Sequence, residues 1–160
     1  MVSALAVAAG VTDPELPMLT LADLGVLRDV EVRDGKVVVS ITPTYTGCPA
    51  MDTMRDDLAH ALLAAGYTDV EIRTVLTPAW SSDWITEHGR QALAEAGIAP
   101  PGRAPSGPIP LTLGITRRGL ACPRCGSADT VETSRFGATA CRALWRCRAC
   151  AEPFEHVKEI

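Results

Sequence analysis

The 160-residue chain is poor in aromatic side chains and has no long hydrophobic run. It contains only 3 Trp, 2 Tyr and 2 Phe, so it lacks the repeated aromatic positions on which nucleic-acid bases stack. No apolar stretch approaches the roughly 20 residues that span a bilayer, which excludes a transmembrane helix. The apolar N-terminal segment lacks a basic region and continues into acidic sequence, so it predicts a short helix rather than a signal peptide. These absences favour a cytoplasmic protein with no membrane partner.

Acidic and basic residues are unevenly distributed along the chain. In total, 15 Lys and Arg stand against 19 Asp and Glu, and this net charge of −4 argues against a nucleic-acid-binding protein. Residues 1–110 hold 7 basic and 14 acidic side chains, whereas residues 111–160 hold 8 and 5. Residues 99–110 contain 5 Pro and 2 Gly, which interrupt helices and strands. We therefore predict a domain at 1–98, a linker at 99–110 and a basic module at 111–160.

The first domain shows the hydrophobic periodicity of a small α/β layer. Alternating Val and Ile positions flank Asp34-Gly35, a dipeptide that favours a tight hairpin turn. The elements expected in chain order are a short N-terminal helix, a hairpin at 30–41, a helix at 49–65, a strand at 70–76 and a helix from Ser81 or Ser82 to Gly97. This order predicts an α+β fold in which helices cover a mixed sheet.

Five of the six cysteines lie in the basic module. Four of them form two Cys-x-x-Cys pairs that are 21 residues apart: Cys122, Cys125, Cys147 and Cys150. Two such pairs place four sulfur atoms around one ion, as structural Zn²⁺ requires. Segments with strand character lie around the pairs, so we predict a small zinc-ribbon β module whose folding depends on the metal.

The spacing alone leaves other uses of these cysteines open. Two disulfides, a redox-active pair and an iron–sulfur cluster are alternatives, although a reducing cytosol disfavours disulfides. Cys141 is either a buried thiol or an alternative metal ligand. Because the module has more basic than acidic residues, a nucleic-acid-binding ribbon remains a competing interpretation.

Cys48 stands apart from the other cysteines, in the loop before the helix expected at 49–65. A thiol at a helix N-terminus faces unpaired N–H groups, which favour the thiolate and make it a better ligand for soft metals. The hydroxyl groups of Thr44 and Thr46 add hydrogen-bond donors. The alternative is an inert buried thiol, because free Cys is among the most buried residue types. The residues by themselves do not decide between these two interpretations.

The motifs of the chain resemble two known families. Those of residues 3–98 resemble the small domain of iron–sulfur cluster assembly factors such as SufT and its eukaryotic cytosolic relatives. The motifs are Asp13-Pro14-Glu15-Leu16-Pro17, Asp23-Leu24-Gly25, the hairpin, the Thr-x-Thr-x-x-Gly-Cys-Pro segment that ends at Pro49, and Pro78-Ala79-Trp80. The cysteine module, with Ser134–Cys141 between its Cys pairs, is similar to that of the PaaD (PaaJ) family. Members of this family are encoded together with the bacterial phenylacetyl-CoA epoxidase.

The resemblance implies an accessory role in aerobic phenylacetate degradation. Such a protein is expected to assist the insertion of an iron–sulfur cluster, or of iron, into the epoxidase complex without being an enzyme itself. The implied client is the reductase subunit, which in this family's epoxidase carries a plant-type [2Fe–2S] cluster, with the diiron oxygenase subunit as the less favoured variant. Three other interpretations stay open: a structural or regulatory subunit of the epoxidase, an enzyme with Cys48 as nucleophile, and a nucleic-acid-binding ribbon.

The resemblance also implies roles for particular residues. Cys48 is expected to handle a transient cluster or iron, in a pocket lined by Asp13, Glu15, Thr44, Thr46 and Trp80. One thiolate binds such cargo weakly, which suits transfer, whereas four fixed cysteines suit structural zinc and client docking. A homodimer would let two Cys48 thiolates meet.

Overall fold

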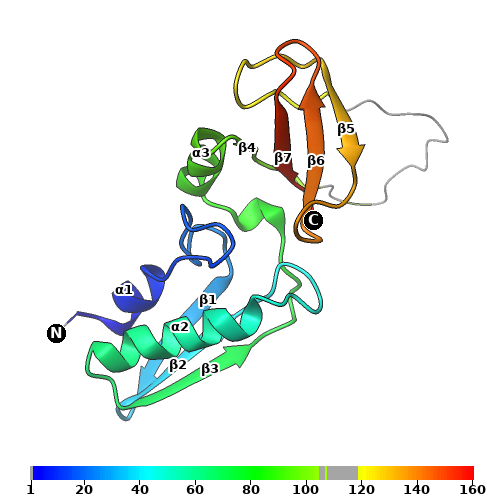
Figure 1. Ribbon diagram of the computed structural model, residues 1–160. Helices are drawn as coiled ribbons and strands as arrows, with labels where there is room; N and C mark the ends of the chain where they lie inside the picture. The colour runs from blue at the N-terminus through cyan, green and yellow to red at the C-terminus, as the bar shows by residue number, and fades with distance from the viewer. Residues whose placement is uncertain (1, 105–106, 108–118) are drawn as a thin grey trace. The chain divides into compact units, whose positions relative to one another are not determined.

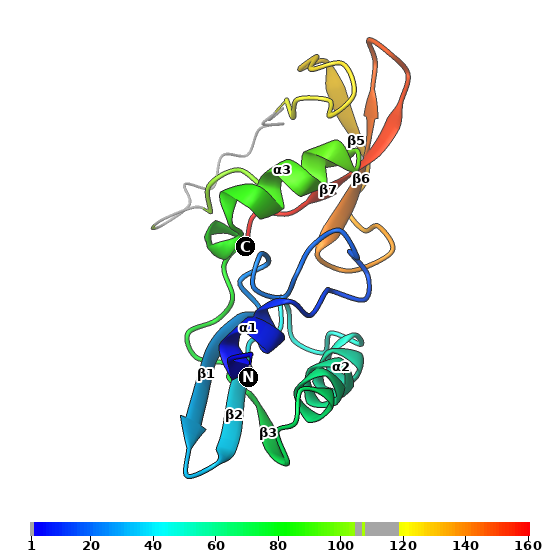
Figure 2. The ribbon, with the colours of Figure 1, turned by 90° about the vertical axis from the view of Figure 1, so that its left-hand side faces the viewer.

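A computed structural model describes residues 2–104, 107 and 119–160. The chain forms two compact units, Met1–Gly89 and Arg90–Ile160, and each contains its own sheet (Figures 1 and 2). Within the described part of the chain, no helix is long and apolar enough to cross a bilayer.

The elements follow the predicted order with two differences. The first unit contains α1 (Ala4–Ala9), β1 (Leu27–Arg33), β2 (Lys36–Ile41), α2 (Met51–Ala64), β3 (Asp69–Thr74) and the 3₁₀ turn η1 (Ser82–Trp84). Helix α3 (Glu87–Glu95) begins in the first unit and ends in the second. The second unit continues with β4 (Ile98–Ala99), β5 (Thr130–Ser134), β6 (Arg142–Cys147) and β7 (Pro153–Val157).

Strand β2 is the centre of a three-stranded mixed sheet in the first unit. It pairs antiparallel with β1 and parallel with β3. The hairpin turn is Asp34-Gly35, and both residues have the positive φ (51° and 84°) that a tight two-residue turn of this kind needs. Along β2 the side chains of Val37, Val39 and Ile41 are fully buried and alternate with partly exposed ones. The predicted mixed sheet with one apolar face is therefore confirmed.

Helices α1 and α2 supply the rest of the apolar core. Met51, Met54, Leu58 and Leu62 recur at helical spacing along α2 and are all buried. Helix α2 contacts β3 and α1, and α1 contacts β1 (Figure 1). The helices thus cover the sheet, as the sequence predicted.

The helix predicted from Ser81 or Ser82 to Gly97 is wrong as a single element. The chain makes η1, extends at Ile85 and starts again as α3. The interruption has a physical cause, because the Thr86 N–H donates to the carbonyl of Asp23 at 2.9 Å instead of to a helical partner. Thr86 then caps α3, since its Oγ1 accepts from the N–H of Gly89 at 3.0 Å.

The second unit contains a four-stranded sheet in the order β4-β7-β6-β5. Strand β4 pairs parallel with β7 and was not predicted. Ala99 therefore belongs to a buried strand and Pro101 is also buried, although the linker was expected to begin at residue 99. The compact units divide after Gly89 rather than after residue 98. Residues 105–106 and 108–118, which cover most of the expected linker and the start of the module, lie outside the described residues.

Candidate functional site

The four cysteines of the two Cys-x-x-Cys pairs meet at one end of the β5-β6-β7 sheet. Their Sγ atoms all lie within 4.8 Å of one another. Between the two pairs, Cys122 and Cys150 are 3.8 Å apart and Cys125 and Cys147 are 3.6 Å apart. Sulfur atoms in a tetrahedron with Zn–S bonds of about 2.3 Å would be about 3.8 Å apart. The group therefore fits a single ion, and an iron–sulfur cluster would hold its ligands further apart because several metal and sulfide atoms lie between them.

Each pair sits in a turn that ends in a left-handed residue. The residue after the second cysteine has positive φ in both turns, 74° at Gly126 and 63° at Ala151. The Cys122 N–H donates to the Ser127 carbonyl in the first turn and the Cys147 N–H donates to the Glu152 carbonyl in the second, each at 2.9 Å. The two turns thus share one backbone conformation. Ala151 adopts it less favourably than Gly126 does, because a Cβ is strained at positive φ.

The thiols of this group affect one another's ionisation. N–H groups of Cys150 and Ala149 stabilise the Cys147 thiolate and lower its pKa to about 7. At Cys150 the Glu152 N–H favours the thiolate, but burial and the three neighbouring thiols prevail and raise the pKa to about 12. The protein alone therefore does not stabilise four thiolates together, whereas a divalent cation does. None of the six cysteines is joined in a disulfide, so the structure does not contain the disulfide alternative.

Cys141 is not a member of the four-sulfur group. It precedes the first residue of β6, whereas Cys147 is the last residue of that strand. Its Sγ lies 3.1 Å from the Thr139 hydroxyl oxygen. The structure therefore assigns Cys141 to the opposite end of β6, away from the metal centre.

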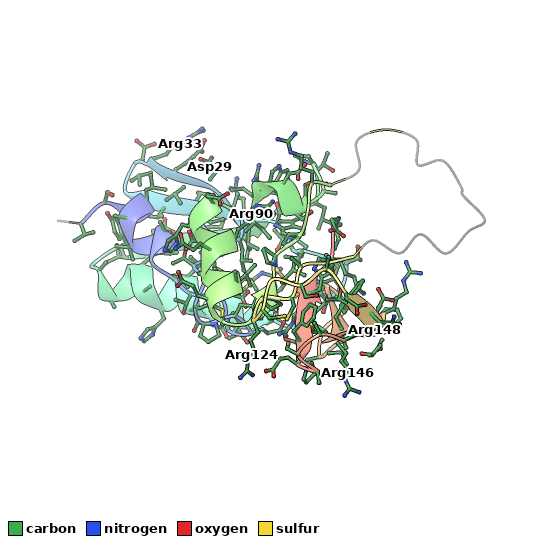
Figure 3. All side chains as sticks on the ribbon, turned by 90° about the horizontal axis from the view of Figure 1, so that it is seen from above. Asp29, Arg33, Arg90, Arg124, Arg146 and Arg148 are labelled. Atoms are coloured by element: carbon green, nitrogen blue, oxygen red, sulfur yellow. The ribbon has the colours of Figure 1, made fainter. Side chains whose placement is uncertain are left out.

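Three arginines are close in sequence to the metal-ligand cysteines. Arg124 and Arg148 lie inside the two Cys-x-x-Cys turns, and Arg146 lies on β6 next to Cys147 (Figure 3). Arg124 forms an ion pair with Glu152 at 2.6 Å. Arg148 lies 3.9 Å from Asp129, so two of these three guanidinium groups are paired with carboxylates.

Cys48 lies just before α2, in the loop that follows β2. Its side chain is 9% exposed, whereas its neighbours Gly47 and Pro49 are exposed, so the sulfur lies just below the surface. The Cys48 carbonyl accepts from the Met51 N–H at 3.3 Å. The N-cap position is Ala50, which has no side chain to cap the helix start. The predicted position of Cys48 at a helix N-terminus is thus observed.

Two other segments of the first unit meet the sheet at the same end as the Cys48 loop. Strands β2 and β3 are parallel and in register from Lys36↔Asp69 to Ile41↔Thr74, so their C-terminal ends lie side by side (Figure 1). The Val75 N–H donates to the Ile41 carbonyl at 2.8 Å, and the Thr42 N–H donates to the Val26 carbonyl at 2.9 Å. The Cys48 loop, the segment toward Trp80 and the residues before β1 therefore start from one edge of the sheet.

Two other predicted site residues form hydrogen bonds with backbone groups of the loop between α1 and β1. Asp13 is 5% exposed, and its Oδ1 accepts from the N–H groups of Glu15 and Leu16, each at 2.8 Å. Trp80 is 4% exposed, and its indole N–H donates to the Leu24 carbonyl at 2.9 Å. Both side chains thus hold this loop in shape. Glu15 and Thr44 are half-buried and Thr46 is exposed; their grouping with Asp13 and Trp80 around Cys48 stays a prediction.

Asp23 anchors the segment after Trp80, a role that the sequence did not reveal. Its carboxylate accepts from the hydroxyl groups of Thr20 (2.7 Å) and Thr86 (2.9 Å), and His88 Nδ1 lies at 3.0 Å. Partial burial acts to raise the pKa of Asp23, but the hydrogen bonds from Thr20, His88 and Thr86 prevail and lower it to about 2. The carboxylate is therefore charged under ordinary conditions and holds Thr86 in place.

Gly25 allows the close approach of Trp84 beside the Asp23 contact. Its φ is +69°, and a Cβ built on it would lie 2.5 Å from the Cβ of Trp84. The Trp84 ring in turn lies under the guanidinium of Arg28, which is 3.6 Å from the ring centroid. The Asp23-Leu24-Gly25 motif is thus explained by the packing of residues 80–88.

Comparison with known proteins agrees with this two-part structure. Residues 4–74 match the model of the iron–sulfur cluster assembly protein family, and residues 108–158 match the PaaD zinc beta ribbon domain. The chain is thus an iron–sulfur assembly domain followed by a zinc ribbon. It is 41% identical over 151 residues to an Escherichia coli K12 protein that is provisionally named as a component of 1,2-phenylacetyl-CoA epoxidase, with 94% of this chain and 87% of that protein covered. The chain therefore belongs to the PaaD family.

Two further matches each cover little more than half of this chain. The Fe-S protein maturation auxiliary factor SufT of Staphylococcus aureus is 32% identical over 85 residues, which cover 52% of this chain and 96% of that protein. The crystal structure of a DUF59 domain from Bacillus anthracis superimposes with a TM-score of 0.52 at 27% identity and covers 56% of this chain and 87% of that domain. The resemblance to SufT-like domains is confirmed by these matches.

Proposed function

We propose that this protein is a cytoplasmic maturation factor for a phenylacetyl-CoA epoxidase and delivers an iron–sulfur cluster, or iron, to the reductase subunit. The observation that carries the proposal is the joining of a SufT-like domain to a PaaD zinc ribbon, in a chain that aligns with 87% of its E. coli relative. That relative is named for the epoxidase, and SufT is named for Fe-S protein maturation. The protein is not itself an enzyme in this proposal.

Cys48 is the residue that we assign to the cargo. Its loop starts from the edge of the sheet where the segment toward Trp80 also starts, and its sulfur lies just below exposed backbone. A single thiolate leaves most coordination positions of an iron or a cluster open, so another thiol or the client must complete them. Cargo held in this way leaves easily, as transfer requires. A second copy of the chain is one source of the additional thiolate.

We further propose that Zn²⁺ is the resident ion of the four-cysteine group. The sulfur separations of 3.6 and 3.8 Å fit its tetrahedral radius, and the donor set contains only thiolates. Cys122, Cys125, Cys147 and Cys150 would hold it, and it would supply structural cross-linking rather than chemistry. Because all four coordination positions are filled by fixed ligands, this centre is not suited to release its ion to a client.

Reconstitution of the reductase tests the proposed function. Apo-reductase is incubated anaerobically with iron, sulfide and thiol, with and without this protein, and the rate of [2Fe–2S] formation is followed by absorbance and electron paramagnetic resonance. We expect the protein to accelerate cluster formation and then to separate from the product on gel filtration. An unchanged rate, together with a stable stoichiometric complex with the epoxidase, would instead identify a structural subunit.

The left-handed residues of the two zinc turns make a further prediction. Gly126→Ala is expected to weaken zinc binding about fivefold, equivalent to about 1 kcal/mol, because Ala at positive φ is strained although no atom crowds its Cβ. Ala151→Gly should strengthen binding by up to the same factor, because it relieves that strain. Competition with a chromophoric chelator measures both affinities. Opposite signs are expected, and a weaker affinity for Ala151→Gly would contradict the account.

A further inference from the structure

The connection between β5 and β6 is a firmly built loop, residues 134–142, which we call the Phe136 loop. The Ser134 hydroxyl both donates to the Phe136 carbonyl at 2.8 Å and accepts from the Phe136 N–H at 3.2 Å. The Gly137 N–H donates to the Arg142 carbonyl at 2.8 Å, and the Arg142 N–H donates to the Thr139 carbonyl at 3.2 Å. This network fixes the path of the loop, which leaves β5 at the end of the strand away from the metal centre.

Charged side chains from β6, β7 and the segment after β7 hold the Phe136 loop through hydrogen bonds. The Arg142 residue is only 8% exposed, and its guanidinium donates to the Thr139 hydroxyl at 3.1 Å and to the Glu155 carboxylate at 2.7 Å. After β7, the Lys158 ammonium donates to the Ala140 carbonyl at 2.8 Å and the Lys158 N–H donates to the Cys141 carbonyl at 2.9 Å. A partly buried ion pair and several backbone contacts thus order a segment that the zinc centre does not touch.

This ordered loop exposes a phenyl ring. Phe136 is 67% exposed, the largest fraction among the large hydrophobic side chains that the structure describes. The Lys158 ammonium lies 4.5 Å from the ring centroid, and the exposed Arg135 precedes it in the chain. Water contact with this apolar ring is unfavourable, and the loop does nothing to bury it. An aromatic side chain on a preorganised backbone, next to cations, has the character of a binding hot spot.

We infer that the Phe136 loop docks the zinc-ribbon unit onto a protein partner. The partner would offer an apolar pocket for the Phe136 ring and carboxylate groups at its rim for Arg135 and Lys158. The charges support this choice, because Glu155 is already paired with Arg142 and residues 90–160 hold ten Lys and Arg against six Asp and Glu. A nucleic acid is the poorer fit, because this loop presents one aromatic ring and not a stacking series.

Binding measurements on full-length zinc-loaded variants test this inference, which rests on the proposed function. Apo-reductase and the remaining epoxidase subunits serve as probes in calorimetry. Phe136→Ala should weaken binding at least about tenfold, and Arg135→Glu should weaken it several-fold and reduce its salt dependence. Leu63→Ala is the matched control, because Leu63 is 53% exposed near the C-terminal end of α2, away from the Cys48 loop, and it should bind as wild type.

The outcomes distinguish the two proposals. If the wild-type protein binds no epoxidase subunit, the proposed function is wrong. If the wild type binds but Phe136→Ala binds equally well and retains its zinc, the docking inference is wrong. If competition with single-stranded DNA or RNA removes Phe136-dependent binding, the loop recognises nucleic acid and the inference is again overturned.

Discussion

The Cys48→Ala variant is expected to mature no more reductase than a reaction without the protein. The physical reason is that this thiolate supplies the proposed bond to the cargo, and Ala offers no ligand atom. The fold should survive, because Cys48 lies in a loop and Ala removes one buried sulfur without adding a clash. The measurement is the rate of [2Fe–2S] formation in apo-reductase, with circular dichroism and zinc content as checks of folding.

Cys141→Ala is the matched control for this variant. Like Cys48, Cys141 forms no disulfide and lies outside the four-sulfur group, and its thiol is partly buried. It should support maturation at the wild-type rate, which would show that a general loss of thiol is not the cause. Normal maturation by Cys48→Ala would refute the assignment of Cys48, whatever the behaviour of the control.

The second large effect is expected for Cys147→Ser. Cys147 is fully buried, and its sulfur accepts hydrogen bonds from the N–H groups of Cys150 and Ala149. Replacing it therefore removes a metal ligand and weakens the hydrogen bonds that hold its turn. Structural zinc contributes on the order of 10 kcal/mol to the folding of small modules. The variant should therefore lose its zinc and the ordered structure of β5, β6 and β7, while the first unit, which has its own core, stays folded.

Elemental analysis and two-dimensional NMR check this prediction. Cys141→Ser provides the control with the same chemical change at the other end of β6, and it should keep one zinc per chain. A Cys147→Ser protein that retains one zinc per chain and a dispersed spectrum for the second unit would show that the four-cysteine group is not the structural centre.

Much of the fold could be predicted because local signals agreed with the tertiary structure. The Asp34-Gly35 turn and the Val alternation around it defined the β1-β2 hairpin, and helical spacing defined α2. The cysteine spacing likewise predicted the metal centre, since two Cys-x-x-Cys turns carry their geometry with them.

The differences arise where long-range contacts decide the structure. Asp23 interrupts the helix expected after Ser82 because it binds Thr86, and no local pattern shows that bond. Strand β4 has two residues and exists because of its pairing with β7. At the candidate site, Asp13 and Trp80 could be selected by motif, but their backbone partners could not be inferred from the sequence.

The central claim is that Cys48 handles iron while the four tail cysteines hold zinc, and metal analysis tests it most directly. Wild type, Cys48→Ala and Cys147→Ser are treated anaerobically with iron, sulfide and thiol, and their iron, sulfide and zinc contents are measured after desalting. We expect wild type to hold one zinc per chain with additional labile iron, and Cys48→Ala to keep the zinc and lose the iron. Iron that persists in Cys48→Ala but disappears with the zinc in Cys147→Ser would contradict the account.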